Sequence, residues 1–162
     1  MQTRAPYPAD TGSADTSATV ELNVVLAYES LSAALWAGEI LAALSRKDSD
    51  QPMVRLLPWS FSTLENPALR RLAAADADQA DLIVIASRGV ASTLSAGFED
   101  WLKTCLTRPR RTARLAVAAL FEPDVRLAGA DSPRLQAVRR LTQAAGCTFF
   151  APRAAEEFAL VV

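Results

Sequence analysis

The chain has 162 residues, a length that suits one domain, and it is 51% hydrophobic and 22% charged, which excludes an intrinsically disordered chain. Its 17 basic and 18 acidic residues leave a formal net charge of −1, so no global charge imbalance indicates binding to nucleic acid or to an anionic membrane. There is no histidine, which excludes the Ser-His and Cys-His nucleophile systems and most zinc sites.

The first 20 residues are rich in Thr, Ser, Ala, Asp and Pro and contain no apolar core of the length that a signal peptide needs. We expect a flexible N-terminal arm over residues 1–20 and one domain over residues 21–162. No apolar run reaches the roughly 18 residues of a membrane span, so we expect a soluble, cytoplasmic protein with no membrane partner. Cys105 and Cys147 form no CxxC pair and are expected to be free thiols, with a disulfide or a reactive thiol as the alternative.

Short β-rich runs alternate with longer helical patterns along the rest of the chain. Strands are expected at residues 22–28, 53–57, 81–87, 114–121 and 147–150. Helices are expected at residues 32–46, 66–79, 95–106 and 133–145. This alternation predicts an α/β, single-domain three-layer sandwich whose five-stranded parallel sheet has the order 2-1-3-4-5.

Individual residues support these boundaries. Pro58 is expected to stop the second strand. Asn66-Pro67 and Ser132-Pro133 each place a capping residue before a proline, which is typical of a helix start. Gly146 is expected to end the last helix. In that helix the apolar positions share one face, and Arg134 is expected with the other arginines on the polar side.

Ligands of such sheets sit beyond the carboxyl ends of the strands, beside the first and third. The turn there reads Tyr28-Glu29-Ser30-Leu31-Ser32. It resembles the phosphate loop of flavodoxins, approximately Tyr-x-Ser-x-Thr-Gly-Asn-Thr, but has Ala33 and Leu35 where that pattern has Gly and the last Thr. The resemblance implies a flavodoxin-like fold and FMN, with the phosphate held by Tyr28, Ser30 and Ser32. The alternative is that the two serines only cap the following helix.

Residues 80–106 resemble the middle of flavodoxin-like and NADPH-dependent FMN reductase-like proteins, in which a strand ends in a ligand loop and a helix with a Trp-Leu pair follows. The reductases' Pro-x-Tyr-Asn is replaced here by Ser87-Arg88-Gly89-Val90. Arg88, Ser92 and Thr93 predict contact with a phosphate or carboxylate, the alternative being a solvated arginine. Trp59 and Trp101 are candidates to stack on a flavin ring, although the helical spacing of Trp101 also suits the core.

The same topology occurs in bacterial receiver domains, which need a phosphoacceptor Asp after the third strand and a Lys after the fifth. Here the third strand ends in Ser87, and residues 150–153 read Phe-Ala-Pro-Arg. The chain therefore resembles a receiver-like shell without the residues for magnesium-assisted phosphoryl acceptance, and no metal site is predicted. An enzyme with an unfamiliar site would place it where Glu29, Arg88 and Glu122 converge.

Two surface features suggest partners. Residues 107–114 hold four arginines but no aromatic side chain, and they follow a helix at the amino ends of the strands, so we expect a solvated loop rather than a nucleic-acid site. The helix over residues 32–46 is apolar on most sides. Leu31, Leu35 and Trp36 make this first helix a candidate homodimer face, the alternative being that the N-terminal arm or the C-terminal tail covers it.

The sequence lacks a histidine, a phosphoacceptor Asp and a complete phosphate loop, and this absence leads to one hypothesis and one alternative. The lead hypothesis is a non-catalytic flavodoxin-like binding or interaction domain without a cofactor, which uses Ser30, Ser32, Arg88 and Ser92 for a small anion or a partner. The alternative is an FMN-dependent oxidoreductase, because a flavin would supply the chemistry that the side chains lack.

Overall fold

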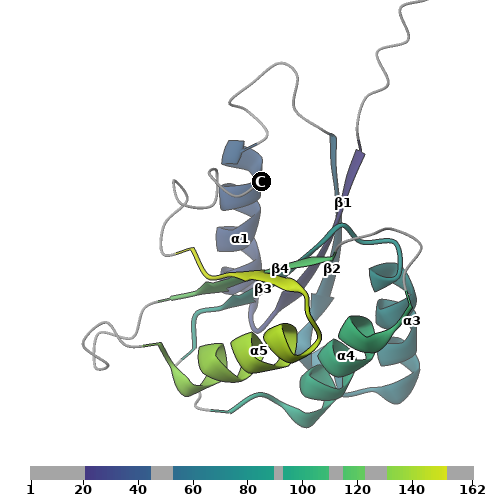
Figure 1. The fold of residues 1–162 in the computed structure, drawn as a ribbon. Helices are drawn as coiled ribbons and strands as arrows, with labels where there is room; N and C mark the ends of the chain where they lie inside the picture. Colours follow the sequence, from purple (N-terminus) through teal and green to yellow (C-terminus); the bar gives the residue numbers. More distant parts are fainter. Residues whose placement is uncertain (1–20, 45–52, 90–92, 110–114, 123–130, 153–162) are drawn as a thin grey trace, which may run out of the picture.

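The computed structural model describes residues 21–44, 53–89, 93–109, 115–122 and 131–152. Five parallel strands form one sheet in the order β2-β1-β3-β4-β5, which confirms the predicted α/β class and strand order (Figure 1). The strands are β1 (Glu21–Tyr28), β2 (Met53–Ser60), β3 (Leu82–Ser87), β4 (Ala116–Phe121) and β5 (Thr148–Phe150). The helices are α1 (Leu31–Leu44), α2 (Phe61–Leu64), α3 (Pro67–Ala77), α4 (Ala96–Thr107) and α5 (Pro133–Ala144).

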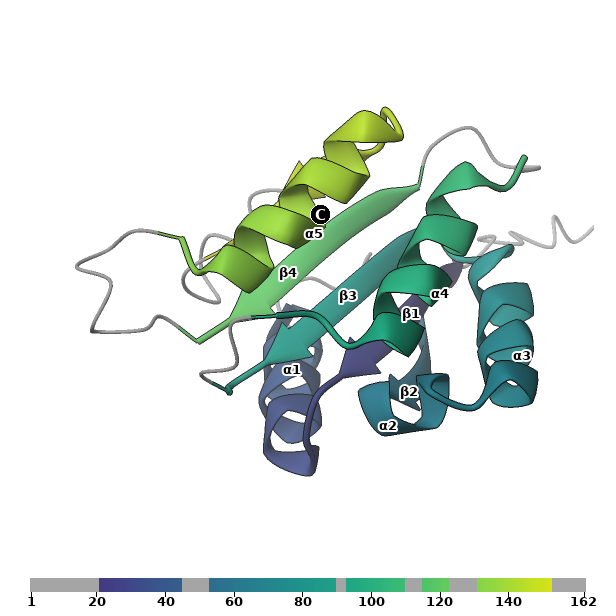
Figure 2. The same ribbon diagram turned by 90° about the horizontal axis from the view of Figure 1, so that it is seen from below.

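The helices divide unequally between the two faces of the sheet. Figure 2 shows α1 on one face and α3, α4 and α5 on the other. The connection from β1 leads to β2 on one side, whereas the later connections run in the opposite direction, so right-handed crossovers place α1 apart from the others. The predicted three-layer sandwich is confirmed, with α1 as the only helix on its face among the described residues.

Each face of the sheet has its own hydrophobic core, because successive side chains of a strand point to opposite faces. In β1, Val24 and Leu26 face the α1 side, whereas Val25 and Ala27 face the side of the other helices. Every residue of β3 is buried, which explains the continuous apolar run that predicted this strand. Trp101 lies in the larger core and is fully buried.

The helix boundaries follow from capping residues. The Asn66 side chain accepts hydrogen bonds from the backbone N–H groups of Ala68 and Leu69, at 2.9 and 3.4 Å. The Ser132 hydroxyl accepts from the N–H of Leu135 at 3.2 Å, and a proline follows both caps. Gly146 has a φ of +71°, a conformation that favours glycine after a helix. These three predicted boundaries are confirmed.

Two local predictions are wrong. Pro58 does not end the second strand, because β2 continues to Ser60. As the edge strand, β2 pairs only with β1 among the described strands, and a proline is tolerated where its missing N–H would face away from the sheet. Residues 61–64, expected as loop, form α2, whose first turn is capped by the Ser60 hydroxyl at 3.1 Å from the N–H of Thr63.

Other expectations are resolved only in part. Cys105 and Cys147 are both free, the first buried and the second half-buried. No helix in the described ranges has the length and hydropathy needed to cross a membrane. The predicted arm over residues 1–20, and most of the arginine-rich stretch 107–114, lie outside the described residues.

Candidate functional site

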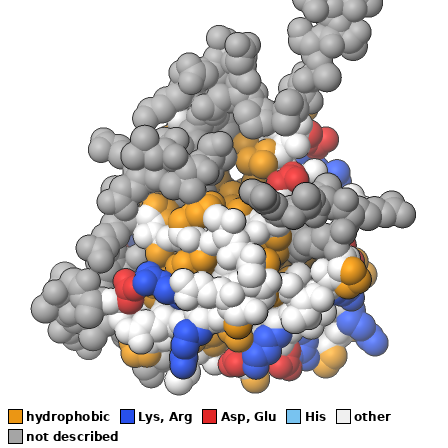
Figure 3. Space-filling model, in the orientation of Figure 1, with side chains coloured by type: hydrophobic (Ala, Val, Ile, Leu, Met, Phe, Trp, Pro, Cys, Tyr) orange, Lys and Arg blue, Asp and Glu red, His pale blue; other side chains and the backbone are white. Residues whose placement is uncertain are grey.

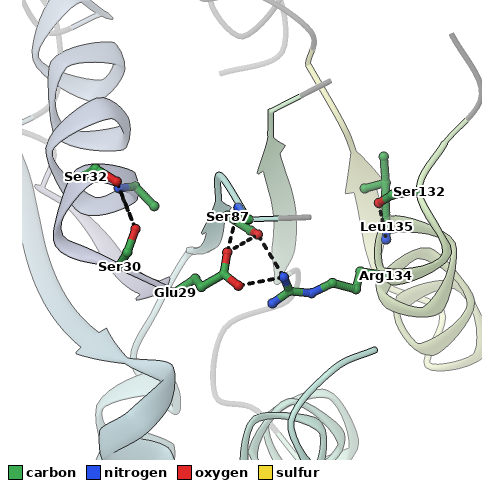
Figure 4. Close-up of polar contacts among 9 residues, drawn as sticks. Glu29, Ser30, Ser32, Ser87, Ser132, Arg134 and Leu135 are labelled. Carbon is green, nitrogen blue, oxygen red and sulfur yellow. Dashed lines mark hydrogen bonds and ion pairs between the residues drawn. The ribbon is translucent and has the colours of Figure 1, made fainter. Parts of the chain in front are cut away.

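The Glu29 carboxylate lies at the centre of the carboxyl edge of the sheet. It accepts hydrogen bonds from the Ser87 hydroxyl at 2.6 Å, from the backbone N–H of Gly89 at 2.9 Å and from Nη1 of Arg134 at 2.8 Å (Figure 4). Nη1 of Arg134 also donates to the Ser87 hydroxyl at 3.2 Å. Three elements, β1, β3 and α5, therefore meet at one carboxylate, and we call Glu29, Ser87, Gly89 and Arg134 the Glu29 cluster.

Strand alternation explains this convergence. The backbone N–H of Glu29 bonds the carbonyl of Ala86 at 3.0 Å, so the extended conformation of β1 continues one residue past Tyr28. Tyr28 consequently packs on the α1 side, and Glu29 points to the opposite face, toward α5. Ser87 has the same orientation as Ile83 and Ile85, which lie four and two residues earlier in β3.

The environment of Glu29 favours its ionised form. Burial alone would raise the pKa of its carboxyl, but the hydrogen bonds from Ser87 and Arg134, the charge of Arg134 and the N–H of Gly89 outweigh it, and the pKa is lowered from 4.5. A carboxylate with a lowered pKa is a weak base at neutral pH. Ser87 is only 2% exposed, so a substrate has no access to its hydroxyl.

Arg134 is the most deeply buried charged residue of the cluster, with 3% of its surface exposed. Its guanidinium carbon lies 5.8 Å from the ring centroid of Phe61 and 6.0 Å from that of Phe121, distances at which a cation is attracted to an aromatic ring. Its Nε has no hydrogen-bond partner in the described part of the chain. The expectation that Arg134 lies with the polar residues of its helix is wrong, because this side chain bonds Glu29 under the carboxyl edge.

A second ion pair lies on the α1 side of the same edge. Arg88 binds Glu122 through two hydrogen bonds, Nε to Oε2 at 3.2 Å and Nη2 to Oε1 at 2.9 Å. Its guanidinium carbon also lies 5.8 Å from the ring centroid of Trp36 in α1. The hydrogen bond from Arg88 lowers the pKa of Glu122. Glu29, Arg88 and Glu122 thus converge on one edge, as the sequence predicts, but in two separate ion pairs.

The two serines of the first turn belong to the start of α1. The Ser30 hydroxyl accepts from the N–H of Ala33 at 3.3 Å, which is the bond of an N-terminal cap. The Ser30 and Ser32 hydroxyls lie 3.0 Å apart and both residues are exposed (Figure 4). The structure therefore shows the capping alternative for Ser30, whereas Ser32 contacts the Ser30 hydroxyl, and both residues remain exposed to solvent.

The remaining predicted site residues lie apart from the Glu29 cluster or outside the described ranges. Trp59, in β2, packs against the larger core and donates from Nε1 to Asp76 at 3.0 Å. Trp101 is fully buried, so the alternative that it stacks on a flavin is wrong. Thr93 is exposed, and Ser92 lies outside the described residues.

Sequence reasoning missed Arg134 and Ser87 as members of the site. Arg134 is the second residue of α5, where the positive end of the helix macrodipole disfavours a cation. An arginine in that position, in a helix that starts near the carboxyl edge, was the available signal. Ser87 carried a weaker one, because it is a polar residue that ends the most apolar strand of the chain.

The described part of the chain holds no group of three or more Cys, Asp or Glu side chains placed to bind a metal ion. It offers instead two carboxylates that are already paired with arginines, and no histidine. This arrangement can bind an anion that replaces Glu122 on Arg88, or it can hold the carboxyl edge of the sheet rigid.

Comparison with solved structures shows a flavodoxin-like fold. The chain is similar to a short-chain flavodoxin associated with a non-canonical PDU bacterial microcompartment, with a TM-score of 0.52 and 13% identity over 87% of this chain and 93% of that one. It is also similar to the flavodoxin of Streptococcus pneumoniae TIGR4, with a TM-score of 0.49 and 14% identity over 87% and 99% of the two chains. No family model and no curated protein matches the sequence.

Proposed function

We propose that this chain is a non-catalytic flavodoxin-like binding domain that acts through its surface rather than through a bound cofactor. The observation that carries this proposal is the Glu29 cluster. At the edge where ligands of this topology sit, the donors of Ser87, Gly89 and Arg134 are already bound to the chain's own carboxylate. An incoming anion would have to displace Glu29 from a partly buried ion pair, which is costly.

The Arg88–Glu122 pair is the more accessible anion site. The side chains of Arg88 and Glu122 are 40% and 45% exposed, and ion pairs with such exposure contribute little to stability. A small phosphate or carboxylate can therefore replace Glu122 on the Arg88 guanidinium at little cost. Trp36 lies against the same guanidinium and would flank the bound anion.

An FMN titration tests the absence of a cofactor. Purified protein is added to FMN while flavin fluorescence is followed, after the visible spectrum of the isolated protein has been recorded. We expect neither a flavin spectrum nor saturable quenching. Saturable binding at about micromolar FMN or below, weakened in the Ser30→Ala/Ser32→Ala variant, would overturn the proposal; about micromolar corresponds to roughly −8 kcal/mol of binding free energy.

FMN binding is the second candidate, and one observation favours it. Ser30 and Ser32 present two exposed hydroxyls 3.0 Å apart at the start of a 14-residue helix, where anions are favoured. The fold is also that of proteins named flavodoxins. The flavin would be an electron carrier in this case, with its phosphate at Ser30 and Ser32 and its ring near Trp36 and Arg88.

A further inference from the structure

A groove of about 420 Å³ lies between α3 and α4, and none of its lining residues belongs to the Glu29 cluster. The two helices lie side by side on the multi-helix face of the sheet (Figures 1 and 2). The groove is lined by Arg70, Arg71, Ala74, Asp100, Lys103, Thr104 and Arg108. Its volume falls within the range of small-molecule sites, roughly 300–1,000 Å³.

The charge of this lining differs from that of the whole chain. Four of the seven lining residues are cationic and one, Asp100, is anionic, whereas the chain has a formal net charge of −1. Two further carboxylates, Asp78 and Glu99, pair with Arg108 and Lys103 from outside the lining, so the four cations exceed the three nearby carboxylates by one charge. Arg70 and Arg71 come from α3, and Lys103 and Arg108 come from the opposite wall. Cations on both walls can hold an anion that carries negative groups at two positions.

The native ion pairs in the groove are easy to exchange. Arg70 contacts Asp100 at 3.1 Å, Lys103 contacts Glu99 at 2.7 Å and Arg108 contacts Asp78 at 2.7 Å, each through one nitrogen. The Asp100 and Lys103 side chains are 68% and 51% exposed, and ion pairs with such exposure contribute little to stability. Arg71 has no ion pair with any described residue. Figure 3 shows Lys and Arg side chains next to Asp and Glu side chains along the lower edge of its face.

The lining also limits the class of ligand. It contains no aromatic side chain, so a nucleobase or another flat ring would find nothing on which to stack. The arginine guanidinium groups match phosphate and carboxylate groups with paired N–H donors. The Thr104 hydroxyl donates its proton to the backbone carbonyl of Asp100 at 2.8 Å. Its oxygen can therefore only accept a hydrogen bond, and only from a ligand group that carries a proton.

We propose that the α3–α4 groove binds a small organic anion that carries two or more phosphate or carboxylate groups. The cations of the two walls hold its separate negative groups, and Ala74 lies beneath them. This site is independent of the function proposed for the carboxyl edge, because none of its lining residues belongs to the Glu29 cluster or contacts Arg88.

Isothermal titration calorimetry of the full chain tests this proposal, with inorganic tripolyphosphate as the phosphate probe and citrate as the carboxylate probe. The groove variant is Arg71→Gln/Lys103→Gln. The matched control is Arg55→Gln/Arg140→Gln, which removes two exposed cations from β2 and α5. We expect saturable binding of at least one probe, about tenfold weaker in the groove variant, unchanged in the control, and weaker at high salt.

The preferred probe assigns the chemistry of the anionic group, and either preference supports the proposal. Absence of saturable heat with both probes would overturn it. An equal loss of affinity in the groove variant and in the control would also overturn it, since that result indicates diffuse attraction to surface charge. A far-ultraviolet circular dichroism spectrum of each variant, which we expect to match that of the unsubstituted chain, verifies that the exposed substitutions leave the fold intact.

Discussion

The Glu29 carboxylate accepts hydrogen bonds from three residues, one of which, Arg134, is the most deeply buried cation among the described residues. Removal of one partner from such an ion pair leaves the other charge buried and unpaired, which is strongly destabilising. Replacement of Glu29 by alanine should therefore cost about 3–5 kcal/mol in the free energy of unfolding. Urea unfolding measures the loss, and an effect below about 1 kcal/mol would contradict the role assigned to the cluster.

The pH dependence of stability provides a separate prediction for Glu29. Because the pKa of its carboxyl is lowered in the folded state, the carboxylate stabilises the fold fully above its usual pKa of 4.5 and loses this contribution as the pH falls through the lowered value. The variant Glu29→Gln lacks this pH-dependent contribution of the carboxylate to stability. The difference in unfolding free energy between the two proteins should thus be constant above pH 4.5 and shrink below it. A difference that grows toward acidic pH would contradict a lowered pKa of Glu29 in the folded state.

Gly97 and Gly38 form a matched pair of helical glycines. A Cβ on Gly97 would lie 2.6 Å from the Leu64 carbonyl oxygen and 2.8 Å from Cα of Glu65, both backbone atoms, whereas a Cβ on Gly38 would meet nothing within 4 Å. Gly97→Ala should destabilise the chain by about 1–3 kcal/mol. Gly38→Ala should stabilise it by up to about 1 kcal/mol, because alanine favours the helix. Equal effects at the two positions, measured by urea unfolding, would contradict the close contact between α2 and α4.

At the scale of elements, the sequence predicts where helices start, but it does not predict how deeply the side chains of those helices are buried. Asn66-Pro67 and Ser132-Pro133 carry the local chemistry of a cap, which depends on a few adjacent residues. The burial of Arg134 depends on Glu29, which lies 105 residues away in the sequence. A periodic pattern assigns an arginine to solvent. The packing of α5 on β4 and β5 reverses that assignment, because it brings the Arg134 side chain to Ser87 and Glu29.

Pro58 is a second residue whose structural effect depends on its place in the fold and not on the local sequence. A proline usually ends a strand because it removes a ladder donor. The strand β2 continues to Ser60 because it lies at the edge of the sheet, and the local sequence does not reveal this edge position. The five-strand order could be predicted because alternation and handedness restrict the topology, whereas the partners of each edge residue could not.

The cap of α3 can be tested as a unit of local structure. Asn66 satisfies two N–H groups of the first turn, so Asn66→Ala should cost about 1 kcal/mol, with a range of about 0.5–2 kcal/mol. Asn66→Ser or Asn66→Asp keeps a capping oxygen and should lose much less. Thermal unfolding of the three variants gives this comparison, and equal losses would indicate that the side chain acts by packing rather than by capping.

At the scale of the whole molecule, the outward side of α1 is unusual. Ala33, Ala37, Ile40 and Leu41 of α1 are buried against the sheet, yet Leu31 and Leu35 on the opposite side are 70% and 62% exposed. Because Leu31 and Leu35 are four residues apart, they lie on one stripe of the helix. An exposed apolar stripe on a folded domain is typical of an interaction surface. The predicted homodimer through Leu31, Leu35 and Trp36 remains our expectation for this stripe.

The composition of the stripe fits a second copy of the same helix. Its leucines lie at the amino end of α1, and the small residues Gly38 and Ala42 lie toward the carboxyl end. In an antiparallel pair related by a two-fold axis, each leucine end meets the small-residue end of the partner, which makes the surface self-complementary. We therefore expect Leu35→Glu to abolish self-association in sedimentation equilibrium, because it would bury a charge without a partner. The control Leu72→Glu changes a leucine of similar exposure, 58%, on α3 and should leave the dimer intact. A wild-type chain that stays monomeric at all concentrations, or a dimer that survives Leu35→Glu, would show that α1 does not bind a second copy.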